Sequence, residues 1–290
     1  MSFLFGSGGN SGSTSTTTTT TRIISSPLVS KKALCVGINN YPDPANRLAG
    51  CINDAIDWAA YLNGLGFSIQ SLIDSNATSK NFKNILGEYF TSSKANDYIV
   101  CTYSGHGSNV PDNDGDEEDG RDECICLYDR FFIDDEIREL FKLVHPEATL
   151  VFISDSCHSG TVTRSFLNSM SFHGDANERL MPRYLPPKDD EEIRSLHFDT
   201  MNKRIFHPEE NMKEILISGC LPTEYSYDAR INGRNNGAMT AFALQVLKGN
   251  APMTFNEFYK KLRTFLPTGR YSQTPQLEGS NDNKQRIMFQ

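Results

Sequence analysis

The sequence lacks the features that mark membrane-spanning, secreted and nucleic-acid-binding proteins. No apolar run approaches the ~20 residues that cross a bilayer, and the start, Met1–Gly6, is too short and uncharged for a signal peptide. Basic residues are outnumbered by acidic ones, 28 to 36, and the net charge of −8 disfavours a nucleic acid or an acidic lipid surface as a partner. We therefore expect a soluble protein without nucleic-acid or membrane partners.

Paired cysteine motifs are also missing. The seven cysteines include only one close pair, Cys124 and Cys126, and neighbours two apart on a strand seldom form a disulfide. No paired CxxC ligand sets for zinc occur, and Cys35 and Cys101 stand inside apolar runs, as small buried hydrophobes do. These patterns predict free thiols in a reducing compartment, so we expect a cytoplasmic protein.

Composition divides the chain into an arm, one domain and an insert. Residues 1–28 are rich in Ser, Thr and Gly, and they cannot bury enough apolar surface to become ordered. Residues 29–290 have the composition of a single globular domain. Within it, residues 161–211 show no periodicity, and we expect a mobile insert there, because long structureless loops inside compact domains are usually functional or disordered.

Strand-like and helix-like patterns alternate along the domain. Apolar runs predict strands at 33–36, 68–72, 98–103, 149–153 and 214–218, and apolar positions at helical spacing predict helices at 53–64, 79–89, 134–143, 238–247 and 255–262. We expect residues 124–128 at the edge of a hairpin, Ser79 as a helix cap and an irregular C-terminal end. This order predicts an α/β fold with a mainly parallel central sheet flanked by helices, whose ligand cleft lies beyond the carboxyl ends of the strands.

Two of the predicted strands lead into turns that carry chemistry. The strand at 98–103 runs into Ser104-Gly-His106-Gly107, and the strand at 149–153 runs into Asp155-Ser-Cys157. Parallel neighbours end at the same edge of a sheet, so the imidazole and the thiol would meet there. A thiol is a useful nucleophile beside such a base, and the backbone N–H groups of Gly107 and Cys157 would stabilise an oxyanion in acyl transfer.

The residues alone leave other interpretations of Cys157 open. A lone cysteine after a strand is often a packed core residue. Arg164 follows it as in a phosphate-binding loop, although the six residues between them are one more than in a phosphatase loop. His106, Cys157 and His158 could bind zinc, although adjacent residues rarely serve one tetrahedral centre. The coincidence of a His and a Cys at two strand ends favours the nucleophile.

The same motifs resemble those of the metacaspases, a family of caspase-like cysteine peptidases. Besides the His and Cys turns, the resemblance rests on Gly50-Cys-Ile-Asn-Asp54, Asp114-Gly-Asp-Glu-Glu-Asp-Gly120, Ile133-Asp-Asp-Glu136, Ile217-Ser-Gly-Cys220 and Ser272-Gln-Thr-Pro-Gln-Leu277. His106 and Cys157 are 51 positions apart, close to the roughly 50 of caspase sequences. The resemblance covers about residues 31–290.

This resemblance implies a caspase-haemoglobinase fold and a Cys-His dyad, with Cys157 as nucleophile and His106 as general base. It also implies cleavage after Arg or Lys, with Asp54 and Asp155 binding the basic side chain and Ser104 beside them, since carboxylates at the base of a cleft pair well with a guanidinium. From the residues alone, Asp54 could instead stabilise the N-terminus of its helix. The resemblance further implies basic peptide or protein substrates, no cofactor required for the chemistry, and a monomer.

Calcium is the one ion that the resemblance suggests. Many metacaspases are activated by calcium held by four aspartates, of which three match Asp122, Asp134 and Asp135, while Arg164 stands at the fourth position. A cation among the ligands works against calcium, so Arg164 could instead pair with the same aspartates. Between Asp112 and Glu123, eight acidic residues and one arginine carry a net charge of −7, in either a solvated loop or a loop that meets a cation.

Basic residues within 161–211 suggest regulation by self-cleavage. Among them are Arg179, Arg183, Lys188, Arg194, Lys203 and Arg204. We expect a zymogen that cuts itself in this segment. The alternative is a catalytically silent scaffold of caspase-like fold, which the presence of His106, Cys157 and both pocket acids disfavours. A caspase that cuts after Asp is also disfavoured, because the pocket acids would repel that side chain.

Overall fold

A six-stranded sheet forms the centre of the computed structural model, which describes residues 29–111, 121–157, 180–187, 212–221 and 224–290. Its strands are β1 (Lys31–Gly37), β2 (Ser68–Ile73), β3 (Tyr98–Ser104), β7 (Thr149–Asp155), β9 (Glu214–Ser218) and β12 (Gln276–Glu278), in the order β12-β9-β7-β3-β1-β2. All neighbours run parallel except β12, which is antiparallel to β9. The predicted α/β fold with a mainly parallel sheet is confirmed.

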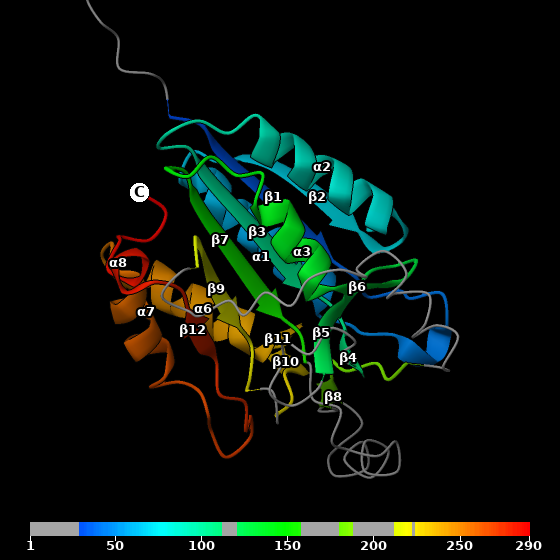
Figure 1. Cartoon of the computed structure of the whole chain (residues 1–290). Coiled ribbons are helices and arrows are strands. Elements are labelled where there is room, and N and C mark those ends of the chain that lie inside the picture. The colour runs from blue at the N-terminus through cyan, green and yellow to red at the C-terminus, as the bar shows by residue number, and fades with distance from the viewer. Residues whose placement is uncertain (1–28, 112–120, 158–179, 188–211, 222–223) are drawn as a thin grey trace, which may run out of the picture.

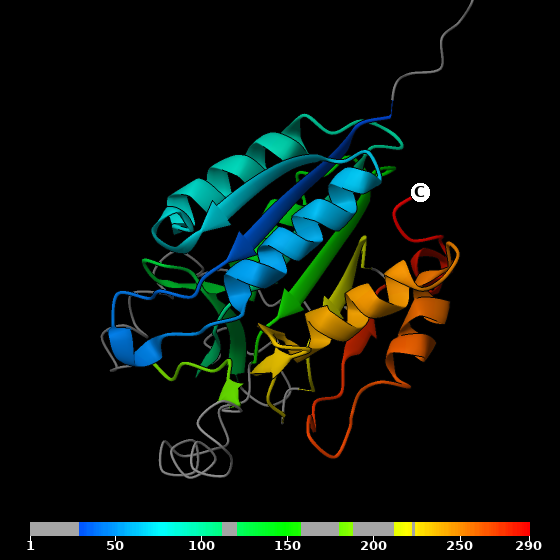
Figure 2. The same ribbon diagram turned by 180° about the vertical axis from the view of Figure 1, so that it is seen from behind.

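Helices cover both faces of this sheet (Figures 1 and 2). On the face toward the viewer in Figure 1 lie α2 (Ser79–Thr91) and α3 (Asp134–Phe141), and on the opposite face lie α1 (Cys51–Gly64) and α6 (Ala238–Lys248). Beside α6 packs α7 (Phe255–Leu262), and a short α8 (Asn281–Lys284) follows β12. The strands are apolar on both sides for this reason: in β1, Ala33 and Cys35 pack with α1, whereas Leu34 and Val36 pack with α2.

Two small antiparallel sheets stand beyond the carboxyl ends of the central strands. One contains β4 (Gly107–Pro111), β5 (Arg121–Cys126) and β6 (Phe131–Ile133), and the other contains β8 (Met181–Pro182), β10 (Tyr227–Ile231) and β11 (Arg234–Gly237). The expectation of a hairpin edge at 124–128 is wrong, because β5 is the middle strand and pairs with both β4 and β6. The β10–β11 hairpin, which the sequence analysis missed, turns at Asn232-Gly233, whose φ angles of 51° and 81° suit an Asn-Gly turn.

Several smaller expectations are settled by the structure. The cap of α2 is Thr78 rather than Ser79, because the Thr78 hydroxyl accepts the Asn81 N–H at 3.2 Å. The C-terminal end is not irregular, since it forms β12 and α8. Single turns of 3₁₀ helix occupy Pro44–Asn46 and Asp74–Asn76. All seven cysteines are free and buried, and no helix in the described ranges is long and apolar enough to cross a membrane.

Part of the predicted insert has a defined place in the fold. Residues 180–187, inside the 161–211 segment expected to lack structure, contain β8, which pairs with β10. This corrects the expectation for that stretch, because its contacts come from strands distant in the sequence rather than from a local periodic pattern. The arm at 1–28, the loop at 112–120, His158 and Arg164 lie outside the described residues.

Candidate active site

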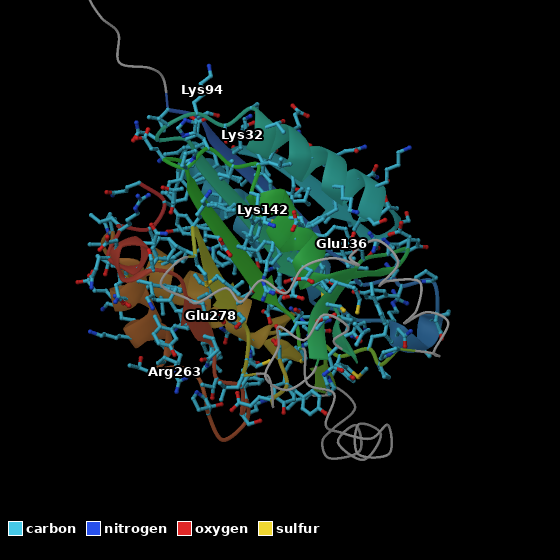
Figure 3. All side chains as sticks on the ribbon, viewed as in Figure 1. Lys32, Lys94, Glu136, Lys142, Arg263 and Glu278 are labelled. Carbon is cyan, nitrogen blue, oxygen red and sulfur yellow. The ribbon has the colours of Figure 1, made fainter. Side chains whose placement is uncertain are left out.

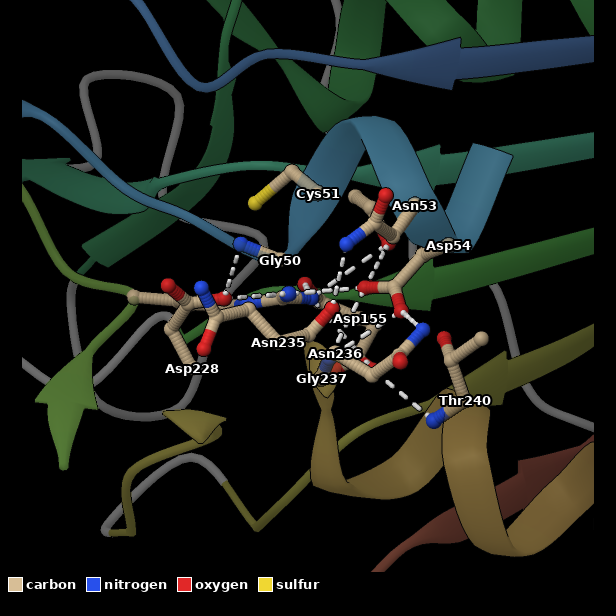
Figure 4. Close-up of polar contacts among 12 residues, drawn as sticks. Gly50, Cys51, Asn53, Asp54, Asp155, Asp228, Asn235, Asn236, Gly237 and Thr240 are labelled. Carbon is tan, nitrogen blue, oxygen red and sulfur yellow. Dashed lines mark hydrogen bonds and ion pairs between the residues drawn. The ribbon is translucent and has the colours of Figure 1, made fainter. Parts of the chain in front are cut away.

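The turns after β3 and β7 bring His106 and Cys157 to one edge of the central sheet, as the sequence predicts. The two strands pair in parallel, with Ser104 opposite Asp155 at their ends. The N-terminus of α1 and the β10–β11 hairpin reach the same edge, so side chains from four separate parts of the chain converge there (Figure 4). This is the edge at which ligands bind in parallel α/β sheets.

His106 is a buried imidazole. Its Nε2 lies 2.8 Å from the carbonyl oxygen of Asn46, so Nε2 carries the proton and Nδ1 keeps a lone pair. Nδ1 is buried and has no hydrogen-bond partner within the described residues. Burial lowers the pKa of His106 to about 4, against the smaller effect of the Asn46 carbonyl, which raises it. At neutral pH the ring is therefore uncharged, with Nδ1 available as a base.

Two tyrosines hold the backbone of His106. The His106 N–H donates to Oη of Tyr41 at 2.8 Å, and Oη of Tyr103 donates to the His106 carbonyl at 2.6 Å. Burial raises the pKa of both phenols well above the ordinary value, so both stay protonated. Gly105 stands between them because a Cβ there would collide with the two hydroxyls. The turn therefore presents the imidazole in one position.

The buried thiol of Cys157 is bonded to Ser226 rather than to His106. Its Sγ accepts the Ser226 N–H at 2.6 Å and lies 3.1 Å from the Ser226 carbonyl oxygen. The expected hydrogen bond between base and nucleophile is therefore not formed in this structure, although both residues stand at the same edge. A thiol in this orientation is not activated by the imidazole.

The pocket predicted for a basic side chain holds Arg183 of the same chain, which is fully buried. Its Nη2 lies 2.7 Å from Oδ2 of Asp54 and 3.1 Å from Oδ1 of Asp228. Its Nη1 lies 3.4 Å from Oδ2 of Asp155 and 3.3 Å from the Ser104 hydroxyl. The structure thus brings together all three residues that the resemblance implies for this pocket, and it adds Asp228.

Backbone N–H groups hold each of the pocket carboxylates (Figure 4). The pairs are Asp54 with Gly237 at 3.0 Å, Asp155 with Thr240 at 2.9 Å and Asp228 with Gly50 at 2.8 Å. Glycine is required at Gly237, because a Cβ there would collide with Asp155 and Arg183. Since the Asp54 carboxylate bonds to the end of β11 and to Arg183, it serves the pocket and not the N-terminus of its own helix.

Three carboxylates face one guanidinium, so the pocket carries an excess of negative charge. Burial raises the pKa of Asp54 to about 6, with Arg183 lowering it and the neighbouring Asp155 raising it further. A cation in the pocket is therefore paired more than once, and mild acid removes part of the charge that attracts it.

The two backbone donors predicted for an oxyanion both point at the carbonyl oxygen of Arg183. The N–H of Gly107 lies 2.8 Å from this oxygen and the N–H of Cys157 lies 3.1 Å from it. The Arg183 N–H in turn donates to the Ser226 carbonyl at 3.0 Å. The segment therefore runs through the site in an extended conformation, with the Arg183–Tyr184 peptide bond beside Cys157.

An arginine of the same helix pairs with two of the aspartates proposed for calcium. Arg138 lies 2.7 Å from Asp134 and 3.5 Å from Asp135, and Asp122 is buried in β5. Over the described ranges, no group of three or more carboxylate, imidazole or thiol side chains could hold a metal ion. Among the described residues, Asp134 and Asp135 therefore have Arg138 as their partner, and Arg164, at the fourth position, lies outside them.

Sequence reasoning missed Asp228 and the place of Arg183. A signal for Asp228 existed: it is a charged residue in a strand that precedes an Asn-Gly turn, and a charge in a buried strand needs a partner. Arg183 has no such signal, because it is one of several basic residues in a segment without periodicity.

The chain is similar to known proteins in both sequence and fold. The caspase domain family, Peptidase_C14, matches residues 30–285. Metacaspase-1 of Scheffersomyces stipitis is 28% identical over 89% of this chain and 73% of its own length. Metacaspase-1A of Aspergillus fumigatus and Metacaspase-1 of Ajellomyces capsulatus are each 29% identical over 89% of this chain, and 71% and 82% of their own lengths are covered. The crystal structure of protein GSU0716 from Geobacter sulfurreducens matches with a TM-score of 0.70 and 28% identity, over 90% of this chain and 98% of that one.

Proposed function

The chain belongs to the caspase domain family and is a caspase-like cysteine peptidase, and we propose that it cleaves peptide bonds after arginine or lysine. The observation that carries this specificity is the burial of Arg183 among the pocket aspartates. Carboxylates arranged around a buried guanidinium attract a basic side chain and repel Asp or Glu.

In the proposed reaction, Cys157 is the nucleophile and His106 is the general base. Rotation about the Cα–Cβ bond of Cys157 turns Sγ from Ser226 toward Nδ1 of His106, which is uncharged and has a lone pair. Nδ1 takes the thiol proton, and the thiolate attacks the carbonyl carbon of the bound basic residue.

The same residues serve the later steps. The N–H groups of Gly107 and Cys157, which bond to the Arg183 carbonyl here, stabilise the oxyanion of the tetrahedral intermediate. The imidazolium of His106 gives its proton to the leaving amine, and the imidazole then activates the water that hydrolyses the thioester. The bond from Nε2 to the Asn46 carbonyl keeps the ring oriented throughout.

We further propose that the protein is a zymogen that cuts itself between Arg183 and Tyr184. In the uncut form Arg183 fills the pocket and its carbonyl takes both oxyanion donors, so a substrate in solution has no access. The Arg183–Tyr184 bond survives while the Cys157 thiol stays bonded to Ser226. Rotation of the thiol to His106 starts cleavage, and departure of the new carboxyl end opens the pocket.

Fluorogenic peptides that end in Arg, Lys or Asp test the specificity. We expect the full chain to hydrolyse the Arg and Lys peptides and not the Asp peptide, and Cys157→Ala to hydrolyse none. Circular dichroism shows whether the variant is folded. If folded wild-type protein hydrolyses none of the peptides even after a cut at residue 183, the catalytically silent scaffold replaces this proposal.

Mass spectrometry of the stored protein tests self-cleavage. We expect fragments that end at Arg183 and begin at Tyr184 in the wild type, and an intact chain in Cys157→Ala. Arg183→Gln should keep that bond, whereas the matched control Lys188→Gln should still be cut there. The same fragments in wild type and Cys157→Ala would show that another protease made them.

A further inference from the structure

A second thiol lies against the nucleophile, and the proposed peptidase reaction does not use it. The motif Ile217-Ser-Gly-Cys220 follows β9, and β9 pairs in parallel with β7, with Ser154 opposite Ser218. Cys157 and Cys220 therefore stand in the turns that follow two neighbouring strands. Both side chains are buried in the same apolar cluster.

The Cys220 thiol lies beside the turn that carries the nucleophile. Its interaction with the Cys157 side chain, together with burial, raises the pKa of the Cys220 thiol well above its ordinary value. Cys220 Sγ is also 3.5 Å from the Glu224 carbonyl and 3.7 Å from the carbonyl of Ser156, the residue before the nucleophile. The orientation that bonds the Cys157 thiol to Ser226 keeps it in the same buried cluster as Cys220 and leaves Nδ1 of His106 without a partner among the described residues.

We propose that Cys157 and Cys220 form a reversible disulfide that holds the nucleophile in the orientation away from its base. The regulatory meaning of this bond rests on the proposed function, because it assumes that Cys157 is the nucleophile. The bond itself requires only two thiols in contact and an oxidant.

Hydrogen peroxide is the oxidant that the proposal names, and the chemistry balances in two steps. The thiolate of Cys157 attacks one peroxide oxygen, an S–O bond forms, the O–O bond breaks, and the hydroxide released takes a proton to become water. The sulfur of Cys220 then attacks the sulfenic sulfur, hydroxide leaves, and the Cys220 proton converts it to a second water. Two thiols are oxidised and one peroxide is reduced. A dithiol such as dithiothreitol reverses the bond by exchange.

One thiol of the pair, that of Cys220, borders a cavity. Cys220 lines a cavity of about 310 Å³ between α3 and strands β5, β7, β9 and β12, which is large enough for a peroxide molecule. The Arg183 backbone covers the Cys157 N–H from the cleft.

The test uses the full chain as wild type, Cys220→Ser, Cys157→Ala and Cys124→Ser. Cys124 is the matched control because it is buried and lines the same cavity, while its thiol bonds to the Asp122 carbonyl. Each protein is treated with hydrogen peroxide, its free thiols are alkylated in denaturant, and it is digested with trypsin without reduction. Peptides 143–164 and 214–230 each contain one cysteine of the pair, and joined by the disulfide they weigh about 2 Da less than their sum.

We expect the joined peptides in wild type and Cys124→Ser and not in Cys220→Ser or Cys157→Ala. Activity toward the Arg peptide should return with dithiothreitol in the first two proteins, and at least about tenfold less in Cys220→Ser, whose Cys157 passes to the irreversible sulfinic acid. If wild-type Cys157 is oxidised without the joined peptides, or if Cys220→Ser recovers as well as wild type, the proposal is wrong. Cys220→Ala replaces the serine variant if that protein does not fold. If no protein cleaves the Arg peptide, the proposed function fails, while the mass measurement still decides on the disulfide.

Discussion

Two clusters of arginine and carboxylate in this molecule have opposite charge balance. In the pocket, one buried cation, Arg183, faces three aspartates. At the start of α3, where Figure 3 labels Glu136, one carboxylate faces two cations. Glu136 lies 2.6 Å from Lys83 and 2.7 Å from Arg130. The second cluster is satisfied by residues that stay in place, whereas the first depends on a cation that the proposed reaction removes.

The pKa values of Asp54 and Glu136 are shifted in opposite directions, as the charge balance of the two clusters predicts. Burial raises the pKa of Asp54 to about 6, and Arg183 does not reverse this effect because Asp155 lies nearby. Burial also raises the pKa of Glu136, but hydrogen bonds from Arg130 and Lys83 outweigh it, and the net pKa is lowered. An excess of carboxylates therefore marks a site built to bind a cation, and an excess of cations marks one built for stability.

Removal of one carboxylate from each cluster should have very different effects on peptidase activity, and this is the largest difference that we expect. We expect Asp54→Asn to lower kcat/KM for an Arg peptide by about 10²-fold or more, because a charge-assisted pair in a buried pocket is lost. Glu136→Gln is the matched control and should stay within about twofold of wild type. Equal losses in both variants would mean that the pocket has no special part in recognition.

The pH dependence of KM sharpens the comparison. Asp54 with its raised pKa takes up a proton as the pH falls through about 6, so we expect KM for the Arg peptide to rise about tenfold between pH 7 and 5. His106, with a pKa of about 4, stays unprotonated over this range, so kcat should change less. In Asp54→Asn the rise in KM should disappear. A rise that persists in that variant would assign the titration to another group.

The free energy of unfolding should depend on the Glu136 cluster, whose substitution is expected to leave activity nearly unchanged. Glu136 has a lowered pKa in the folded state, so its contribution to the free energy of unfolding is present above the unfolded-state pKa and is lost as the pH falls through the folded-state value. We expect Glu136→Gln to lose about 1–2 kcal/mol at pH 7 by urea denaturation, with the difference from wild type shrinking in acid. A difference that grows in acid contradicts this sign.

Chelation should have the smallest effect. Because Arg138 already pairs with Asp134 and Asp135, we expect ethylene glycol tetraacetic acid to change kcat/KM for the Arg peptide by less than about twofold. A larger loss that added calcium restores would mean that calcium displaces Arg138 from these aspartates.

The sequence predicts the frame of the site because its main residues follow local patterns. His106 and Cys157 come directly after apolar runs, and parallel pairing of β3 and β7 then decides that they meet. The pocket residues Asp54, Ser104 and Asp155 could be expected only from the metacaspase-like motifs, and the structure does bring them together.

Two features had no local pattern to reveal them. Arg183 reaches Asp54 from a position 129 residues away in the sequence, and neither residue's neighbours carry information about that contact. The bond of the Cys157 thiol to Ser226 depends on a rotation about one side-chain bond. Pairings over such separations are decided by tertiary packing, which composition and periodicity do not encode.

In the proposed zymogen, the Arg183 segment is also a tethered competitor of the substrates. A short tethered segment has an effective concentration of the order of millimolar. A peptide of similar affinity at micromolar concentration would therefore occupy the pocket roughly a thousand times less often than the tether. In the proposed self-cleavage each molecule cuts its own tether, so the rate should be independent of the protein concentration. The onset of activity should therefore show a first-order lag whose length does not change when the protein is diluted.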